Sequence, residues 1–193
     1  NGVFTERLVE AAKRQGVKKF IYLSTAHAYN STLAGVITED TTLKNSPPYA
    51  TSHVAGENAV ISESGAEMQS VIVRLANSFG YPSSTNVNCW TLVVNELCKQ
   101  ATFERRLVIR GPSNRSRNFI TMTDTCLGIE CLINHKVESK SPLICNLGDK
   151  TKTIFEIASE IKKIYLDDKG ITLEIVELSK DSLVTSCLDF RSL

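Results

Sequence analysis

The chain has 193 residues, enough for one domain, or for one domain plus an incomplete neighbour. Hydrophobic residues make up 42% and charged residues 22%, and the balance of 22 basic against 21 acidic side chains gives no electrostatic reason to expect binding to nucleic acid or a membrane surface. No apolar run approaches the roughly 20 residues that span a bilayer and no secretory signal is visible, so we expect a cytoplasmic protein.

The first third of the chain alternates between helical and strand patterns. Phe4, Leu8 and Ala11 recur at helical spacing, and the run KFIYLS is short, apolar and rich in β-favouring residues. The predicted elements, in chain order, are a helix from residue 1 that ends at Gly16, a strand over 19–24, a loop over 25–47, a helix that starts with Ser46 as its cap and ends near residue 64, and a strand over 69–75.

The rest of the chain continues this alternation less regularly. The predicted elements are a loop over 77–88, a helix over 89–102, a strand over 107–109, a polar turn over 111–118, an extended stretch over 119–122, a helix over 123–134, a strand over 143–146, a helix over 153–166 and a strand over 171–176. Alternating helices and short apolar strands indicate an α/β fold with a largely parallel sheet. A change in composition near Asn77 suggests a partial sheet core over 1–76, followed by a smaller mixed α/β region over 77–193 that is interleaved with the remaining core elements.

The six cysteines form no CxxC pair, and none has a histidine at metal-ligand spacing. Most of them lie within apolar patterns. We therefore expect reduced, partly buried thiols rather than disulfides or a metal site.

The segment PPYATSHVAGE, residues 47–57, places Tyr49 four residues before His53 in the first turns of a helix, where residues four apart share a face. A tyrosine is a poor acid or base near pH 7 unless a nearby cation favours its phenolate, and a histidine does this only when it is protonated. From these residues alone, an ordinary helix start with two exposed side chains competes with a catalytic pair. The preceding strand favours catalysis, because it puts Ser24 and Thr25 at its carboxyl end, where open α/β sheets bind ligands.

The order of these segments resembles the extended short-chain dehydrogenase/reductases, the family of nucleotide-sugar epimerases and dehydratases. The resemblance covers nearly the whole chain and rests on seven blocks in family order: the helix from Asn1, KKFIYLST, AYN, PPYATSHVAGE, VIVRLANSFGYP, SRNFITMTD and CNLGDKTKTIFEIASEI. It implies a Rossmann-like parallel sheet, the C-terminal part of a doubly wound fold, with NAD or NADP as cofactor and a nucleotide-sugar as substrate.

The resemblance also implies catalytic roles for three residues. Thr25 matches the family's catalytic Ser/Thr, and Tyr49 matches its catalytic acid/base. His53 stands where the family has a lysine that polarises the tyrosine and hydrogen-bonds the nicotinamide ribose. Tyr49 and His53 would therefore contact the cofactor as well.

Substrate binding is implied for a second group of residues. Asn77 and Arg117 match residues that contact the nucleotide-sugar diphosphate, and an arginine fork suits phosphate oxygens. Arg110 and Arg115 lie close by in the sequence and are candidates to assist. Without the resemblance, a solvated basic turn explains these arginines equally well.

The chain departs from the family pattern at several positions. His53 replaces the lysine, Asn30 replaces the glycine of the YG pair, and Asn118 replaces an aspartate. Ala26 and His27 stand where the 4,6-dehydratases have Asp-Glu; alanine cannot transfer protons, which argues for an epimerase or keto-reductase. We expect His27 to be a solvent-contacting loop residue rather than a substitute base.

No GxxGxxG turn, the family's pyrophosphate cradle, occurs in the chain. We therefore expect a fragment of a nucleotide-sugar epimerase or oxidoreductase, inactive by itself, that serves surface polysaccharide synthesis. The alternative is a non-catalytic relative that binds a nucleotide-sugar or a partner protein. The resemblance also implies a homodimer that packs through the helices over 3–15 and 49–62.

Overall fold

Three parallel strands form the central sheet of the computed structural model, which describes residues 2–29, 35–44, 46–84, 86–136, 141–178 and 188–191. The strands β1 (Lys19–Thr25), β3 (Gln69–Leu75) and β7 (Leu143–Leu147) lie in the order β1-β3-β7. Thr25 is paired with Leu75, and Leu75 with Leu147, so the carboxyl ends of all three strands meet at one edge of the sheet. The predicted α/β fold with a parallel sheet is confirmed.

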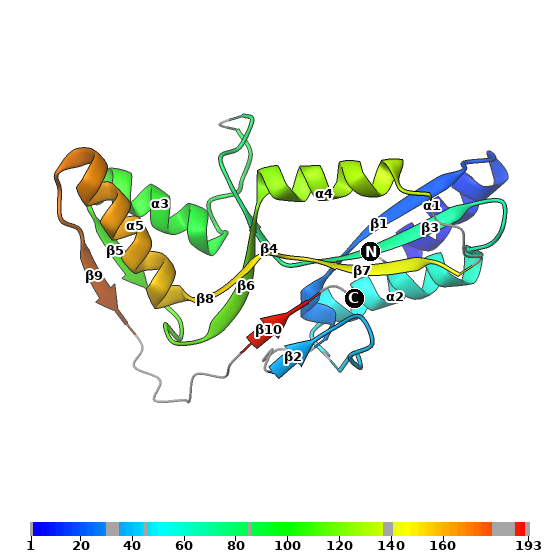
Figure 1. Cartoon of the computed structure of the whole chain (residues 1–193), viewed down its shortest axis with the longest axis horizontal. Coiled ribbons are helices and arrows are strands. Elements are labelled where there is room, and N and C mark those ends of the chain that lie inside the picture. Colours follow the sequence, from blue (N-terminus) through cyan, green and yellow to red (C-terminus); the bar gives the residue numbers. More distant parts are fainter. Residues whose placement is uncertain are drawn as a thin grey trace.

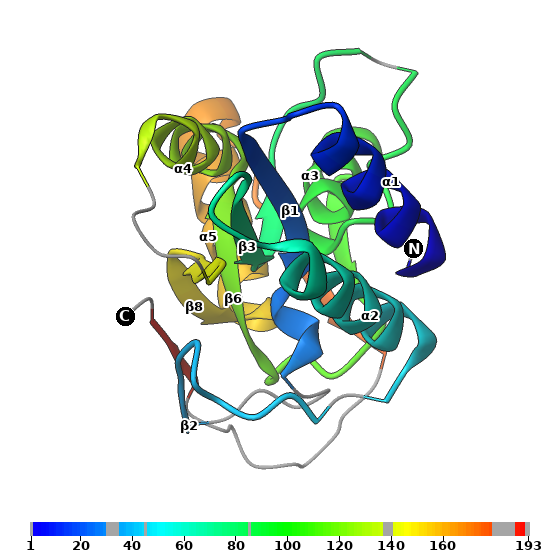
Figure 2. The same cartoon turned by 90° about the vertical axis from the view of Figure 1, so that its right-hand side faces the viewer.

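Helices cover both faces of this sheet. They are α1 (Gly2–Arg14) and α2 (Pro48–Glu63) on one face and α4 (Met122–Asn134) on the other (Figures 1 and 2). Alternate residues of β3 pack against the helices on opposite faces of the sheet: Ile72 packs with Val9 and Val60, whereas Val73 packs with Leu132. Because β3 is buried on both sides, it is apolar along almost its whole length, as expected for a central parallel strand.

A second region extends away from the sheet edge where these strands end (Figure 1). It contains a sheet of order β4-β6-β8, a parallel pair β5-β9 and two helices. The bounds are β4 (Asn77–Phe79), α3 (Val93–Phe103), β5 (Arg106–Ile109), β6 (Ser116–Thr121), β8 (Lys150–Thr153), α5 (Ile154–Lys169) and β9 (Glu174–Glu177). Its core joins Leu97 of α3, Leu107 of β5 and Ala158 of α5.

Two short elements complete the fold near the carboxyl end of β1. The 3-10 turn η1 (Ala26–Ala28) follows β1 directly, and β2 (Gly35–Ile37) pairs in parallel with β10 (Leu188–Phe190). Tyr29 is buried against this pair. Asn1 and Asn30, discussed above, and Cys187, one of the six cysteines, lie outside the described residues.

The sequence prediction was wrong about several element boundaries. The predicted loop over 77–88 begins with β4, and the predicted turn over 111–118 runs into β6, because these short strands are polar and are held by their neighbours rather than by an apolar run. The helix predicted over 89–102 begins at Val93, since Leu92 has an extended ψ of 129°. Ser46 does not cap α2: Pro47 occupies the cap position and makes no side-chain hydrogen bond there.

The expectation of buried thiols was also wrong in part. Cys98, Cys126 and Cys131 are exposed, because they lie on the outer faces of α3 and α4, whereas Cys89 and Cys145 are half-buried.

Over the described ranges, no helix combines the length and the apolar character that crossing a membrane requires.

Candidate active site

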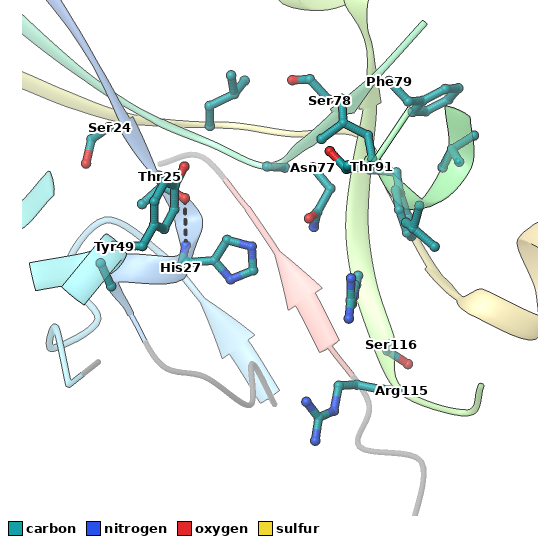
Figure 3. Close-up of a pocket in the computed structure, with 18 of the residues that line it drawn as sticks. Ser24, Thr25, His27, Tyr49, Asn77, Ser78, Phe79, Thr91, Arg115 and Ser116 are labelled. Carbon is teal, nitrogen blue, oxygen red and sulfur yellow. Dashed lines mark hydrogen bonds between the residues drawn. The ribbon is translucent and has the colours of Figure 1, made fainter. Parts of the chain in front are cut away.

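A cavity of about 680 Å³ opens between the carboxyl edge of the main sheet and the second region. Figure 3 shows Thr25, His27 and Tyr49 on one side of it, and Asn77 and Arg115 on the other. The polar and charged side chains in its wall are Ser24, Thr25, His27, Tyr49, Asn77, Ser78, Thr91, Arg115, Ser116 and Arg117. The cavity therefore brings together Thr25, Tyr49, Asn77 and Arg117, four residues that are far apart in the sequence.

The main-sheet side of the cavity carries the hydroxyl groups of Thr25 and Tyr49, in addition to that of Ser24. Thr25 is the last residue of β1, and its Oγ1 accepts a hydrogen bond of 3.2 Å from the backbone N–H of His27 (Figure 3). Tyr49 lies in the first turn of α2 and is 58% exposed, so its phenol is accessible to a ligand in the cavity. The Thr25 and Tyr49 hydroxyls come from the strand end and the helix start that flank the same loop.

His53 lies one helical turn beyond Tyr49 and does not line the cavity. The two rings are in edge contact, with centroids 4.7 Å apart. Its Nδ1 lies 3.4 Å from the hydroxyl of Tyr22 on β1. Burial lowers the pKa of His53 below its ordinary value of 6.5, so the imidazole is neutral at pH 7 and does not supply the fixed positive charge of a lysine.

His27 is a more central residue than the sequence suggested. It is half-buried in the loop after β1, where η1 places the side chain in the cavity wall and its ring centroid lies 6.4 Å from that of Tyr49. Burial, and after it the charge of Arg117, lower the pKa of His27, and a hydrogen bond to the Asn77 side chain opposes them. His27 thus contacts residues on both sides of the cavity.

The second region contributes positive charge. Asn77 begins β4, and its Nδ2 donates a 2.9 Å hydrogen bond to the carbonyl of Asn118 on β6. Burial lowers the pKa of Arg117, and the neighbouring Arg115 lowers it further. Among the described residues that line the cavity there is no carboxylate to balance these two guanidinium groups. This side of the cavity is therefore suited to an anion.

Arg110 does not line this cavity. It lies at a separate cavity of about 210 Å³ beside α3, where it forms an ion pair with Glu96. Arg117 borders both cavities. Of the three candidate arginines, Arg115 and Arg117 line the main cavity and Arg110 does not.

The sequence analysis missed a buried polar network behind the site. Arg74 of β3 donates to Glu57 of α2 at 2.8 Å and to the hydroxyl of Tyr29 at 3.0 Å. Ser24 donates to the same Glu57 carboxylate, and the Tyr29 hydroxyl donates to Asn146 at 2.7 Å. The spacing in the sequence does indicate Glu57, because it follows His53 by four residues and so lies on the helix face that carries Tyr49 and His53.

Comparison of the chain with known proteins identifies its family. The family model described as "NAD dependent epimerase/dehydratase family" matches residues 1–148. The dTDP-D-glucose 4,6-dehydratase of Bos taurus is 28% identical over 162 residues, which are 81% of this chain and 42% of that protein. The chain thus spans less than half the length of this curated relative.

Solved structures share the fold. The UDP-glucose 4-epimerase of Thermotoga maritima, solved with UDP-glucose, has a TM-score of 0.78 and 18% identity, with 97% of this chain and 59% of that one covered. The UDP-glucuronic acid 4-epimerase of Bacillus cereus, solved with NAD, has a TM-score of 0.76 and 22% identity, with 100% and 58% covered. Together with the family match over residues 1–148, these findings show that the chain belongs to the NAD-dependent epimerase/dehydratase family.

Proposed function

We propose that this chain carries the acid/base residues and the nucleotide-sugar site of an epimerase or oxidoreductase that acts on the sugar by transient hydride transfer. One observation carries the proposal: two hydroxyl side chains, Thr25 and Tyr49, line the same cavity as the cations Arg115 and Arg117, and no carboxylate lies among the described residues of its wall. A nucleotide-sugar has the matching chemistry, with a sugar hydroxyl at one end and an anionic diphosphate beside it. Such an enzyme would act in the cytoplasm and supply sugars for surface polysaccharides.

In the proposed reaction, Tyr49 takes the proton of a sugar hydroxyl while Thr25 hydrogen-bonds the same oxygen. The carbon that bears this oxygen becomes a carbonyl as its hydride leaves. When NAD is bound, it supplies the hydride acceptor and later the hydride donor. Return of the hydride to either face of the carbonyl accounts for epimerisation.

Asn77 and Arg117 are proposed to hold the diphosphate. The Arg117 guanidinium is half-buried and repelled by Arg115, and a bound diphosphate would relieve this repulsion. Arg110 is already paired with Glu96, so we propose a lesser, indirect role for it at the edge of the site.

The described residues fit one end of NAD. Tyr49 is exposed at the carboxyl edge of the sheet, and Nε2 of the neighbouring His53, whose Nδ1 contacts Tyr22, can hydrogen-bond a ribose hydroxyl whenever it is not bound to Tyr49. These two residues would hold the nicotinamide ribose. The printed sequence has no glycine-rich turn that would bind the NAD pyrophosphate, so no motif in it accounts for the contacts at the other end of the cofactor.

Epimerisation or keto-reduction is favoured over dehydration. The position that would hold the first acid of a dehydratase is Ala26, which is 4% exposed and has no group that transfers protons. A dehydratase that relied on this position would need a carboxylate in its place.

A second copy of the chain is the proposed partner. The helices α1 and α2 pack side by side (Figure 2), and α1 buries Thr5 and Val9 against the molecule while it leaves Val3, Phe4 and Leu8 exposed. Ile61 of α2 is exposed as well. A homodimer through these helices would cover the apolar side chains, and light scattering that gives a monomer mass would contradict it.

Calorimetric titration with UDP-glucose, and then with NAD, tests the proposed function. We expect the nucleotide-sugar to bind and glucose alone not to bind, because the cations recognise the diphosphate. Equal binding of glucose and UDP-glucose would contradict the proposal.

The competing function, non-catalytic binding of a nucleotide-sugar or a partner protein, is favoured by His53 in place of lysine. Turnover by the full-length wild-type protein with NAD, and its loss in a His53→Lys variant, would exclude that alternative. Turnover by the His53→Lys variant but not by the wild type would support the non-catalytic alternative.

A further inference from the structure

The side chain of Tyr22 lies against α2 at a place where the helix has no side chain of its own. A Cβ atom at Gly56 would stand 2.2 Å from the Tyr22 hydroxyl oxygen and 2.5 Å from Cζ, so any residue other than glycine would displace the ring. The slot over Gly56 brings the Tyr22 hydroxyl within 3.4 Å of both Nδ1 and the carbonyl oxygen of His53.

The hydroxyl has three neighbours and only one proton. Burial raises the pKa of Tyr22, so the phenol stays protonated at neutral pH, and Thr5 is its third hydrogen-bond partner. The carbonyl oxygen of His53 can only accept. All three contacts are made together only if the hydroxyl donates to this carbonyl and accepts from Thr5 and from Nδ1–H of His53. If it donated to Nδ1 instead, the contact with the carbonyl would be lost.

We propose that Tyr22 is a positioning residue that holds His53 in its Nδ1–H tautomer, which leaves the lone pair of Nε2 available to the Tyr49 hydroxyl. This inference rests on the proposed function of Tyr49. The hydrogen bond at one ring nitrogen decides which nitrogen carries the proton. The rings of Tyr49 and His53 are in edge contact, with centroids 4.7 Å apart, and in the proposed arrangement Nε2 and the Tyr49 hydroxyl form a hydrogen bond when substrate is bound.

The tautomer gives His53 a role that differs from that of a lysine. As the sugar hydroxyl gives its proton to the Tyr49 oxygen, the O–H bond of Tyr49 breaks and an N–H bond forms at Nε2 of His53. The phenol stays neutral, the imidazole becomes an imidazolium, and the sugar carbon loses its hydride, which NAD would accept when bound. The reverse transfer returns the proton. A lysine acts through its permanent charge, whereas this histidine acts as a proton acceptor.

Nitrogen-15 NMR of histidine-labelled protein tests the contact without any turnover. The chain has three histidines, His27, His53 and His135, so a His53→Gln variant identifies the signals of His53. Above the pKa of His53, we expect a protonated Nδ1 and an unprotonated Nε2. A wild-type spectrum in which Nε2 carries the proton would overturn the inference.

Two variants and a matched control complete the test. Tyr22→Phe keeps the ring and removes the hydroxyl, so the tautomer should shift towards Nε2–H. Gly56→Ala should have the same effect by displacing the ring, and Tyr22→Phe alone decides if Gly56→Ala does not fold. Tyr81→Phe removes the hydroxyl of a tyrosine that is 85% exposed, and should leave the His53 signals unchanged. An unchanged tautomer in Tyr22→Phe would refute the role of Tyr22.

Activity provides the second readout and separates the two proposals. In the full-length protein with NAD bound, Tyr22→Phe should lower kcat by about tenfold and leave KM within about twofold, as expected for one hydrogen bond that supports an acid/base step. A tautomer shift in a full-length protein that has no turnover would support the contact and refute the proposed function. Turnover that is equal in wild type and Tyr22→Phe would support the proposed function and refute the relay.

Discussion

The ion pair between Glu57 and Arg74 should be a main determinant of the stability of the main sheet. Glu57 is 1% exposed and Arg74 5% exposed, and the pair joins α2 to β3 with an N–O distance of 2.8 Å. Glu57→Gln preserves the size and shape of the side chain but removes its charge. It leaves the Arg74 guanidinium buried with neutral acceptors only: the Tyr29 hydroxyl, the carbonyl of Glu39 and the amide oxygen at position 57.

Removing one partner of a buried pair destabilises a protein by about 3–5 kcal/mol, because the remaining charge has lost both its partner and its water. For a chain of this size each kcal/mol lowers Tm by roughly 2–4 °C. The same helix carries a matched control: Glu63 pairs with Lys13 at 2.9 Å, but both side chains are solvent-accessible. Glu63→Gln should therefore change the free energy of unfolding by no more than about 1 kcal/mol.

Urea unfolding, followed by far-UV circular dichroism, measures both variants. The double variant Glu57→Leu/Arg74→Met removes both charges and should recover most of the loss, because an apolar pair of similar volume needs no partner. Equal effects of Glu57→Gln and Glu63→Gln, or a double variant as unstable as Glu57→Gln, would show that the buried charge is not the cause.

Three further predictions concern the site. In the full-length protein, Tyr49→Phe should lower kcat by about 10²–10⁴-fold and leave UDP-glucose binding within a few-fold; an unchanged kcat would remove Tyr49 as the acid/base. Arg117→Met should weaken UDP-glucose binding by about 10- to 100-fold, the equivalent of roughly 1.5–3 kcal/mol for hydrogen bonds to a charged group, while Arg110→Met should change it little, and calorimetry that ranks the two the other way would contradict the assignment. Because burial lowers the pKa of His27 and of His53 below 6.5, the folded protein binds fewer protons than the unfolded chain between 6.5 and the lowered values. Stability should therefore fall as the pH decreases through this window. Over this pH window, the urea midpoint of a His27→Gln/His53→Gln variant should fall less than that of the wild type. Equal pH dependence of the two midpoints would refute this prediction.

The main sheet could be predicted because its strands are apolar on both faces. KFIYLS and QSVIVRL are such strands, and the observed β1 and β3 differ from the predicted ranges by at most one residue. The second region was harder to predict because its strands are short, polar and stabilised by pairing. Arg117 and Asn118 of β6 are paired with Lys152 and Thr151 of β8, a contact between segments more than 30 residues apart that no local pattern contains.

The candidate site shows a similar division. Motif positions identified Thr25, Tyr49, Asn77 and Arg117, and the fold brings them to one cavity. Spacing alone could not show that Arg110 is paired with Glu96 beside a different cavity, or that η1 brings His27 into the wall. The partner of His53 was equally hidden, since Tyr22 reaches it across helix α2 only because residue 56 is a glycine.

The two sides of the cavity should contribute independently to catalysis unless His27 couples them. Tyr49 belongs to α2, whereas Arg117 belongs to β6, and no direct contact joins the two among the interactions described above. The effects of Tyr49→Phe and Arg117→Met on kcat/KM should therefore add, within about 0.5 kcal/mol. His27 is different, because it lies beside the Tyr49 ring, hydrogen-bonds Asn77 and is repelled by Arg117. His27→Gln should deviate from additivity with each of the other two variants. A double-mutant cycle in which His27→Gln is additive with both would show that the imidazole does not connect the acid/base side with the diphosphate side.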